Sequence, residues 1–469
     1  MKLVMINPAV LEAGVFRNSY NDKLKWIKSG NRAVVPFEPP IGLAGLVAWL
    51  KVKGYDVSLL DMQGLGMDED QLRAYLTANR PDVVGVTAMT PTFPSALKVA
   101  SIVKSSLPGA RVMLGGVHPS VEPESALADK AVDFVVRGEG EHAVAALLDA
   151  LESCSSLDGI EGLCYRVGGD MVISEKARSF LDLDALPIPD YDSFPLETYI
   201  DHLKNLCGFE GGRGVTMLVS RGCPFQCAFC AVRETMGRNW RIKTPKRVVD
   251  EMEFLQEKFN LTSIWFKDSI LNVNKRWTRE FCTEILTRGI NIEWHCNTRV
   301  EMVEEEELKL MKRAGLAQID IGIESGSPAS RKVLNKNYSN LQIEKAVAIA
   351  RKYAKVFGYF MIGIPGETEE DIAMTFNMAR ELKLDRVSWY IYNPLPGSEL
   401  YDRLIEEGKM TAAELDHNAI QYGKNNFELS RVPKSRLEDI YRQINEYFYK
   451  GIEPAFEGEL GRLTSVQDG

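Results

Sequence analysis

The stretch that decides the fold runs Thr216-Met-Leu-Val-Ser220-Arg221-Gly-Cys223-Pro-Phe-Gln-Cys227-Ala-Phe229-Cys230. Its first residues are mostly apolar or β-branched and predict a buried strand, and the glycine and proline that follow predict a loop. Three cysteines separated by three and then two residues on such a loop are typical of a metal site.

The metal is best interpreted as iron in an iron–sulfur cluster, because soft thiolate ligands suit such centres. Cys223, Cys227 and Cys230 are the predicted ligands, and three cysteines leave one iron of a four-iron cluster open for a substrate or cofactor. Zinc is the alternative, but a structural zinc site takes four ligands, and no nearby Cys or His supplies the fourth. Three unliganded cysteines packed together are the structural alternative.

Strand and helix patterns alternate from this first strand onward. Strands are predicted at 216–220, 263–266, 292–296, 318–323, 358–364 and 386–392, and helices at 244–259, 275–288, 304–314, 341–354 and 369–383. Six β/α repeats predict a partial (β/α)6 TIM barrel over residues 211–400, with functional residues on the loops that follow the strands. A helical C-terminal region is expected over 401–469.

A separate β/α series occupies residues 1–152. Strands are predicted at 3–7, 56–61, 83–89, 111–116 and 134–137, with amphipathic helical stretches between them. This alternation predicts an α/β domain of the flavodoxin/Rossmann-like, doubly wound type, which binds ligands beyond the carboxyl ends of its strands. Residues 153–210 are predicted to be a linker with a β-hairpin.

Glycines and polar residues gather at three strand ends of this first domain. They are Thr87, Met89, Thr90 and Pro91 after the third strand, Gly115, Gly116 and His118 after the fourth, and Gly138 and Glu139 after the fifth. Glycines allow close approach of a ligand, and helix N-termini favour anionic groups, so three such loops on one edge predict a pocket. For any single loop, ordinary turn and cap residues are the alternative. No Gly-x-Gly-x-x-Gly follows the first strand, which argues against a dinucleotide site.

Composition excludes several classes of protein. The 469 residues are 45% hydrophobic and 26% charged, as expected of a soluble globular protein, and the net charge of −9 argues against a nucleic-acid binder with a basic surface. No apolar run approaches the roughly 18 residues of a membrane span, and no secretory signal is recognisable. Eight cysteines are too few for a disulfide scaffold. A cytoplasmic enzyme is the expectation.

The motif Cys223-x3-Cys227-x2-Cys230, with Phe229 before the last cysteine, resembles the signature of radical S-adenosylmethionine (SAM) enzymes. The resemblance implies a [4Fe–4S] cluster whose open iron chelates the amino and carboxylate groups of SAM, and a reductant such as flavodoxin or ferredoxin. Reduction of the bound sulfonium would yield a 5′-deoxyadenosyl radical.

The resemblance also implies SAM contacts at the strand ends. Phe229 would lie near the adenine, Gly363 and Gly366 resemble the family's adenine-contacting segment, and Glu324, followed by Ser325, would bond the ribose or amino group. Arg299 would pair with the carboxylate, and Asp268 and Asn297 end neighbouring strands. Capping and turn roles are the alternative for these residues.

The N-terminal domain resembles that of the cobalamin-binding subgroup of these enzymes. The segments that carry this resemblance are Thr90-Pro91, Gly115-Gly116-x-His118-Pro119 and Gly138-Glu139-Gly140-Glu141. The subgroup includes class B methylases, the anaerobic ring cyclase of bacteriochlorophyll synthesis and hopanoid-modifying enzymes. The chain lacks the Asp-x-His-x-x-Gly motif that supplies an axial histidine elsewhere, so cobalamin would bind without a protein histidine on cobalt. His118 either points at the cofactor tail or is a satisfied turn histidine.

Taken together, these features predict an enzyme that uses cobalamin and a radical to methylate an unactivated carbon of a small-molecule or lipid-like substrate. One SAM would make the radical, and another would remethylate cobalamin. The alternatives are a radical cyclase, a ring-contraction or rearrangement enzyme, a family member that has lost cobalamin, and a non-catalytic cluster-binding or zinc-binding regulator. A tRNA-thiolating relative is disfavoured because a basic RNA-binding tail is absent.

Overall fold

A computed structural model describes residues 1–12, 15–16, 38–176, 180–206, 212–417, 420, 423–424 and 426–454. Contacts within the chain divide it into two compact units. The first unit comprises Met1–Pro224, Ala231–Lys243 and Leu395–Gly397, and the second comprises Phe225–Cys230, Thr244–Pro394 and Ser398–Gly469.

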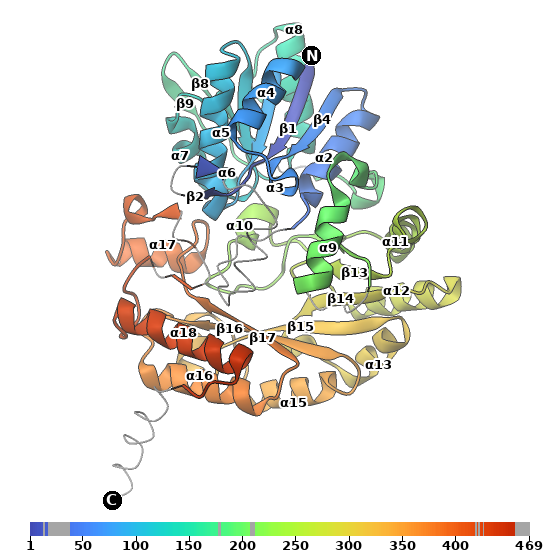
Figure 1. The fold of residues 1–469 in the computed structure, drawn as a ribbon, viewed down its shortest axis with the longest axis vertical. Coiled ribbons are helices and arrows are strands. Elements are labelled where there is room, and N and C mark those ends of the chain that lie inside the picture. The colour runs from blue at the N-terminus through green and yellow to red at the C-terminus, as the bar shows by residue number, and fades with distance from the viewer. Residues whose placement is uncertain are drawn as a thin grey trace, which may run out of the picture. The chain divides into compact units, whose positions relative to one another are not determined.

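The first sheet has the order β4-β1-β5-β6-β7-β8-β9. Its paired strands β1 and β4 are labelled in Figure 1. Its strands are β1 (Lys2–Asn7), β4 (Asp56–Asp61), β5 (Val83–Thr87), β6 (Arg111–Gly115), β7 (Phe134–Val136), β8 (Leu163–Val167) and β9 (Asp170–Val172). The first five strands are parallel, and their order is that of the flavodoxin type, so the predicted doubly wound fold is confirmed. The hairpin β8–β9, predicted within the linker, pairs antiparallel with β7 and extends this sheet.

The helices of this unit lie between its strands, where amphipathic stretches were predicted. They are α2 (Ile41–Val52), α3 (Met62–Leu65), α4 (Glu69–Asn79), α5 (Phe93–Ser106), α6 (Val117–Val121), α7 (Pro123–Ala128), α8 (Gly140–Ser153), α9 (Leu196–Leu206) and α10 (Val232–Met236). Two-stranded sheets join β2 (Leu11–Glu12) to β3 (Val15–Phe16), and β11 (Ser220–Arg221) to β12 (Arg241–Ile242).

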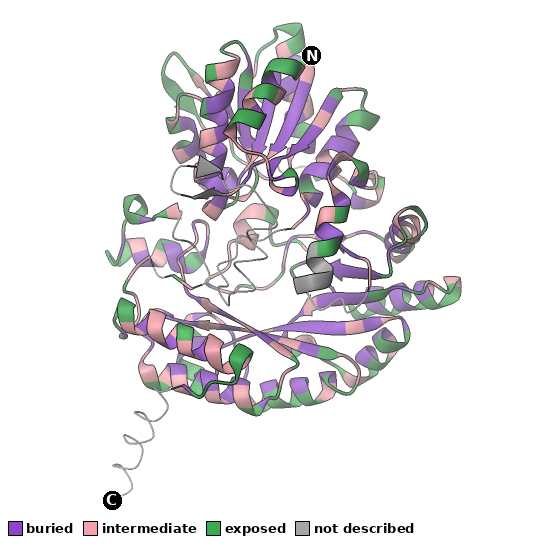
Figure 2. Ribbon diagram, in the orientation of Figure 1, coloured by how far each residue is buried: buried purple, intermediate pink, exposed green. Residues whose placement is uncertain are grey.

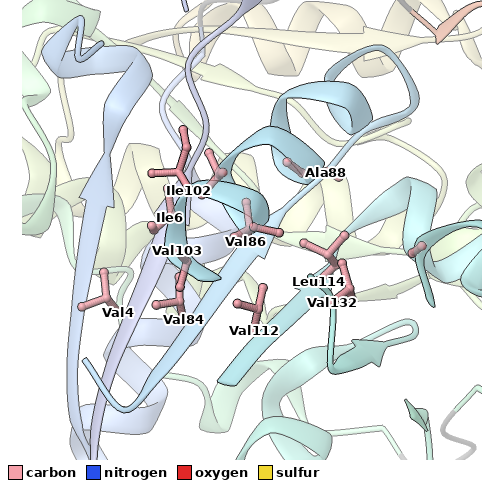
Figure 3. Packing of buried hydrophobic residues seen from close by; sticks show 14 of the residues in the cluster. Val4, Ile6, Val84, Val86, Ala88, Ile102, Val103, Val112, Leu114 and Val132 are labelled. Atoms are coloured by element: carbon pink, nitrogen blue, oxygen red, sulfur yellow. The ribbon is translucent and has the colours of Figure 1, made fainter. Parts of the chain in front are cut away.

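Alternating β-branched residues explain the burial of the first sheet. Val84 and Val86 of β5 and Val112 of β6 are buried in one apolar cluster with residues of β1 and α5 (Figure 3). Strands of both sheets are largely buried, while the helices carry exposed residues (Figure 2). Burial on both faces is what parallel sheets require.

The second sheet has the sequential order β10-β13-β14-β15-β16-β17, which is the predicted half-barrel. Its strands are β10 (Gly214–Met217), β13 (Ser263–Phe266), β14 (Glu293–Thr298), β15 (Leu316–Glu324), β16 (Lys355–Ile362) and β17 (Arg386–Ile391). Its helices are α11 (Pro245–Phe259), α12 (Lys275–Arg288), α13 (Glu305–Arg313), α14 (Pro328–Val333), α15 (Asn340–Ala350), α16 (Glu369–Glu381), α17 (Glu399–Glu406) and α18 (Lys434–Lys450).

One strand of this sheet differs from the prediction, and one pairing is irregular. The strand expected at 216–220 ends at Met217, because Ser220 and Arg221 pair antiparallel with Ile242 and Arg241 instead. The β15–β16 register shifts between Gly322 and Glu324, at the strand end that carries predicted site residues. No helix in the described ranges is long and apolar enough to cross a membrane.

Candidate functional site

A cavity of about 290 Å³ lies at the carboxyl ends of β5, β6 and β7, and every residue that lines it belongs to the first unit. Five of the residues predicted to bind cobalamin line it, namely Thr87, Gly115, Gly116, Gly138 and Glu139. They come from all three predicted loops. The position is the one that open α/β sheets use for ligands.

Glycines keep this cavity open. Gly42 and Gly45 of α2 line it, and a Cβ atom added at either position would meet nothing within 4 Å. At Gly85 of β5, an added Cβ would lie 2.5 Å from the Met5 sulfur and 2.7 Å from the Met113 methyl group. Helix glycines cost stability relative to alanine, so two of them facing one space indicate that the space is used.

The other predicted cobalamin residues lie outside the lining of this cavity. Met89 is exposed, whereas Thr90 is buried and opens a short 3-10 turn that includes Pro91. His118 is 1% exposed, its ring centroid lies 4.1 Å from that of Phe93, and its Nε2 lies 3.3 Å from the Ser125 hydroxyl. His118 is therefore packed inside the first unit.

An ion-pair network stands at the edge of the cavity. Arg221 places Nη1 2.7 Å from Glu139 Oε2 and Nη2 2.5 Å from Glu141 Oε1. Arg241 forms an ion pair with the other oxygen of Glu139. Arg221, Glu139 and Glu141 all line the cavity, and Arg221 precedes Cys223 by two residues.

The three cysteines are half-buried thiols outside any disulfide. The backbone N–H of Cys223 donates to Gly237 O at 3.1 Å in the first unit, whereas Cys227 and Cys230 belong to the second unit. Among the described residues, no three His, Cys, Asp or Glu side chains gather closely enough to hold a metal ion. The three cysteines still fit a cluster held by thiolates, because a cationic side chain lies beside the sulfur of Cys227.

That cation is Arg299, which follows β14. Its Nη1 donates to Cys227 Sγ at 2.8 Å, its Nη2 donates to Glu301 at 2.7 Å, and its guanidinium lies 4.2 Å from the Phe225 ring centroid. Burial alone would lower the pKa of Arg299, but Glu301 and Cys227 raise it above its ordinary value. A buried positive charge therefore lies directly beside one of the predicted cluster ligands.

Glu324 ends β15 in an unusual backbone conformation, with φ at +66°. Its carboxylate lies 3.1 Å from Lys336 Nζ, and both side chains are at most 10% exposed. Burial lowers the pKa of Lys336, but Glu324, Tyr338 and Cys227 together more than offset this, so the net shift is upward. Lys336 also lies 5.9 Å from the ring centroid of Phe229. Strain in a non-glycine residue commonly marks a functional position.

Sequence reasoning missed Lys336, which lies twelve residues beyond Glu324 after α14. The lysine alone gave no signal, because its partner becomes apparent only when the chain after α14 returns to the end of β15. Lys336 Nζ also donates to Gly322 O at 3.1 Å.

Ser325 and the Gly363-Gly366 loop belong to a buried polar network. The Ser325 hydroxyl lies 2.9 Å from that of Thr375, and Glu367 accepts hydrogen bonds from Ser330 Oγ and from the backbone N–H of Gly363 and Ile364. Burial raises the pKa of Glu367 to about 8. The loop holds positive φ at both of its predicted glycines, 76° and 79°.

The remaining predicted residues lie at neighbouring strand ends. Asn297 of β14 donates from its amide to Asp268 O at 2.9 Å, which joins the loops after β13 and β14. The Asp268 side chain is 2% exposed. Both residues stand with Arg299, Glu324 and the Gly363 loop at the carboxyl ends of their strands, as predicted.

Two family models match the chain. Residues 29–148 match the B12 binding domain, and residues 217–379 match the Radical SAM superfamily. An uncharacterized methyltransferase of Pyrococcus horikoshii is 32% identical over 377 residues, covering 80% of each chain. An anaerobic magnesium-protoporphyrin IX monomethyl ester cyclase of Rubrivivax gelatinosus is 31% identical, covering 80% of this chain and 68% of the cyclase.

Solved structures share the fold. The cobalamin-dependent SAM radical enzyme OxsB superposes with a TM-score of 0.72 at 18% identity, covering 99% of this chain and 71% of OxsB. The radical SAM methyltransferase TsrM of Kitasatospora setae gives 0.70 at 19% identity, covering 89% and 77%. With both domains matched and relatives above 30% identity, the chain belongs to the cobalamin-dependent radical SAM enzymes, whose cofactors are a [4Fe–4S] cluster, SAM and cobalamin.

Proposed function

We propose that this enzyme transfers a methyl group to an unactivated carbon of a small-molecule or lipid-like substrate. The observation that carries the proposal is the glycine-lined cavity at the edge of the first sheet, lined by five residues predicted for cobalamin. A cytoplasmic flavodoxin or ferredoxin is the proposed source of electrons. When bound, the cluster and SAM supply a hydrogen-abstracting radical, and cobalamin supplies the methyl group.

In the first unit, the cavity residues would bind and orient cobalamin. Gly115, Gly116 and Gly138 allow the backbone to approach the cofactor, and Gly42 and Gly45 leave room on the α2 side. The apolar lining, which includes Leu43, Leu46 and Val144, would exclude water from the buried part of the cofactor.

Charged groups at the strand ends of the half-barrel would orient SAM. Cys223, Cys227 and Cys230 would hold the cluster, and Arg299 keeps a positive charge at Cys227. The Glu324–Lys336 pair offers an acceptor and a donor for the amino and carboxylate groups of SAM. Glu367 fixes the backbone of the loop at Gly363, which is proposed to contact the adenine.

The test is anaerobic reconstitution with iron, sulfide and hydroxocobalamin, followed by metal analysis and incubation with methyl-labelled SAM and a reductant. About four irons and one cobalt per chain, with SAM cleaved to 5′-deoxyadenosine, are expected. Label must then appear in a product. Cleavage without any labelled product across a broad substrate panel would count against methyl transfer.

A radical cyclase without methyl transfer is the second candidate. It is favoured by the 31% identity to the magnesium-protoporphyrin ester cyclase. For a cyclase, the same experiment gives 5′-deoxyadenosine and a product of altered ring structure that carries no methyl label.

A further inference from the structure

The strand β11 places Arg221 between two sites. Arg221 lies two residues before Cys223, and its side chain lines the cavity proposed for cobalamin. It pairs in the β11–β12 ladder with Arg241, so the backbone at this point is held by sheet hydrogen bonds. The backbone of Arg221 is thus held close in sequence to the cluster ligand Cys223, while its side chain lines the cavity proposed for cobalamin.

The Arg221 side chain forms ion pairs with two carboxylates, and both of these carboxylates are largely buried. Its Nη1 donates to Glu139 at 2.7 Å and to Glu141 at 3.3 Å, and its Nη2 donates to Glu141 at 2.5 Å. The side chains of Glu139 and Glu141 are 14% and 7% exposed. Glu139 also pairs with Arg241. The planar guanidinium matches such a fork of carboxylates, and a lysine supplies only a single point charge. Because Arg221 is paired with both Glu139 and Glu141, a shift of the loop that carries these two residues would move the Arg221 side chain.

The backbone between Arg221 and Cys223 has little slack. Gly222 has φ at +86°, and an added Cβ would lie 2.2 Å from Asn239 O. The Cys223 N–H donates to Gly237 O at 3.1 Å. A displacement of Arg221 would therefore reach the Cys223 thiol and would not be absorbed by a flexible hinge.

The chain that leaves the cysteine motif also lines the cavity. Thr235 and Met236 of α10 line it, five and six residues after Cys230. Glu234 of the same helix pairs with Lys176 at 3.1 Å. Both chain segments that flank the motif thus border the space proposed for cobalamin.

From these contacts we propose that Arg221 is a positioning residue that couples cobalamin binding to the first cluster cysteine. Cobalamin in the cavity fixes the Glu139–Glu141 loop, and Arg221 passes that order to Cys223. Because such coupling is reciprocal, the cluster-loaded protein binds cobalamin more tightly than the cluster-free protein. This inference rests on the proposed cobalamin site.

The test measures hydroxocobalamin affinity by anaerobic equilibrium dialysis, with cluster-loaded and cluster-free protein. The wild-type ratio of the two dissociation constants is expected at roughly 5 to 150, the usual range of allosteric coupling. In Arg221→Gln the ratio falls close to 1, and Arg221→Lys recovers part of it. Arg73→Gln is the matched control. Arg73 forms an ion pair with Glu69 at 2.7 Å, and neither residue lines the cavity. This variant is expected to keep the wild-type ratio.

The outcomes separate the inference from the function on which it rests. Wild-type protein that binds no cobalamin refutes the proposed site itself. Wild-type protein that binds both cofactors with a ratio of 1, or an Arg221→Gln variant that keeps the full ratio, refutes the coupling alone. Glu141→Gln breaks the same ion pair from the cavity side, so it decides the question if Arg221→Gln does not fold.

Discussion

Filling the cavity from α2 separates cobalamin binding from folding. Gly45 lines the cavity, its φ is not positive, and nothing lies within 4 Å of an added Cβ. Gly45→Phe therefore introduces a ring into open space. Removing a helix glycine stabilises a helix by about 0.5–1 kcal/mol for alanine and somewhat less for phenylalanine. The variant is expected to fold at least as stably as the wild-type chain.

The same ring occupies space that cobalamin needs. Overpacking a well-fitted site costs about 1–3 kcal/mol, which corresponds to a loss of affinity of roughly fivefold to 150-fold. After anaerobic loading and removal of free cofactor, Gly45→Phe should retain far less cobalt than the wild-type protein and the same iron. Gly45→Ala is the control, because it gains the helix stability while it leaves most of the 290 Å³ open.

The result that refutes this reasoning is specific. If Gly45→Phe binds cobalamin with wild-type affinity while its melting temperature is unchanged or raised, the cofactor does not occupy this cavity. If both Gly45→Phe and Gly45→Ala lose cobalamin equally, the glycine is needed for the backbone of α2, and the space beside it is not the reason.

Three further predictions concern other parts of the molecule. Lys336→Met leaves the Glu324 carboxylate buried without its cation, which costs about 3–5 kcal/mol; urea denaturation of the cluster-free protein should show it, and an unchanged midpoint would contradict it. Glu367 has a folded pKa of about 8, so the folded state holds a proton that the unfolded chain has lost; stability should fall as the pH rises from about 4.5 to 8, and Glu367→Gln should flatten that slope in thermal melts at several pH values. Because His118 is packed on Phe93 and no histidine lines the described cavity, the electron paramagnetic resonance spectrum of bound cob(II)alamin should be the same for protein made with ordinary and with 15N-labelled histidine; a change in nitrogen splitting on labelling would refute the assignment.

Local patterns predicted most of the fold because the apolar periodicity and the end residues of each strand and helix lie within a few residues of one another. The helix predicted at 275–288 coincides with α12, because Asn274 caps its start and Gly289 takes the left-handed conformation at its end. The strand predicted at 216–220 ends early because its last residue pairs with Ile242, a partner twenty-two residues away that no local pattern indicates.

The site residues that lie in loops after strands were predicted from the sequence, and those that lie on helices were missed. Gly115, Gly138 and Glu139 line the cavity because strand ends of a parallel sheet share one edge. Gly42 and Gly45 were missed because a helix glycine, read alone, indicates only weak helix propensity. His118 drew attention as a polar residue at a strand end, but its ring packs on Phe93, and only three-dimensional packing distinguishes the two roles.

Arg221 shows why the cysteine motif is more than three ligands. Sequence reasoning places Arg221 in the loop after the strand at 216–220, yet Arg221 belongs to β11, which pairs with β12, and its side chain forms ion pairs with Glu139 and Glu141. If the coupling at Arg221 holds, the cluster loop is most ordered when cobalamin is present, and SAM cleavage responds to cobalamin. An enzyme whose radical would otherwise be wasted or would damage the protein gains from that response. The decisive comparison is SAM cleavage without substrate: cobalamin should change its rate in the wild-type protein and leave it unchanged in Arg221→Gln, and an equal change in both would refute the argument.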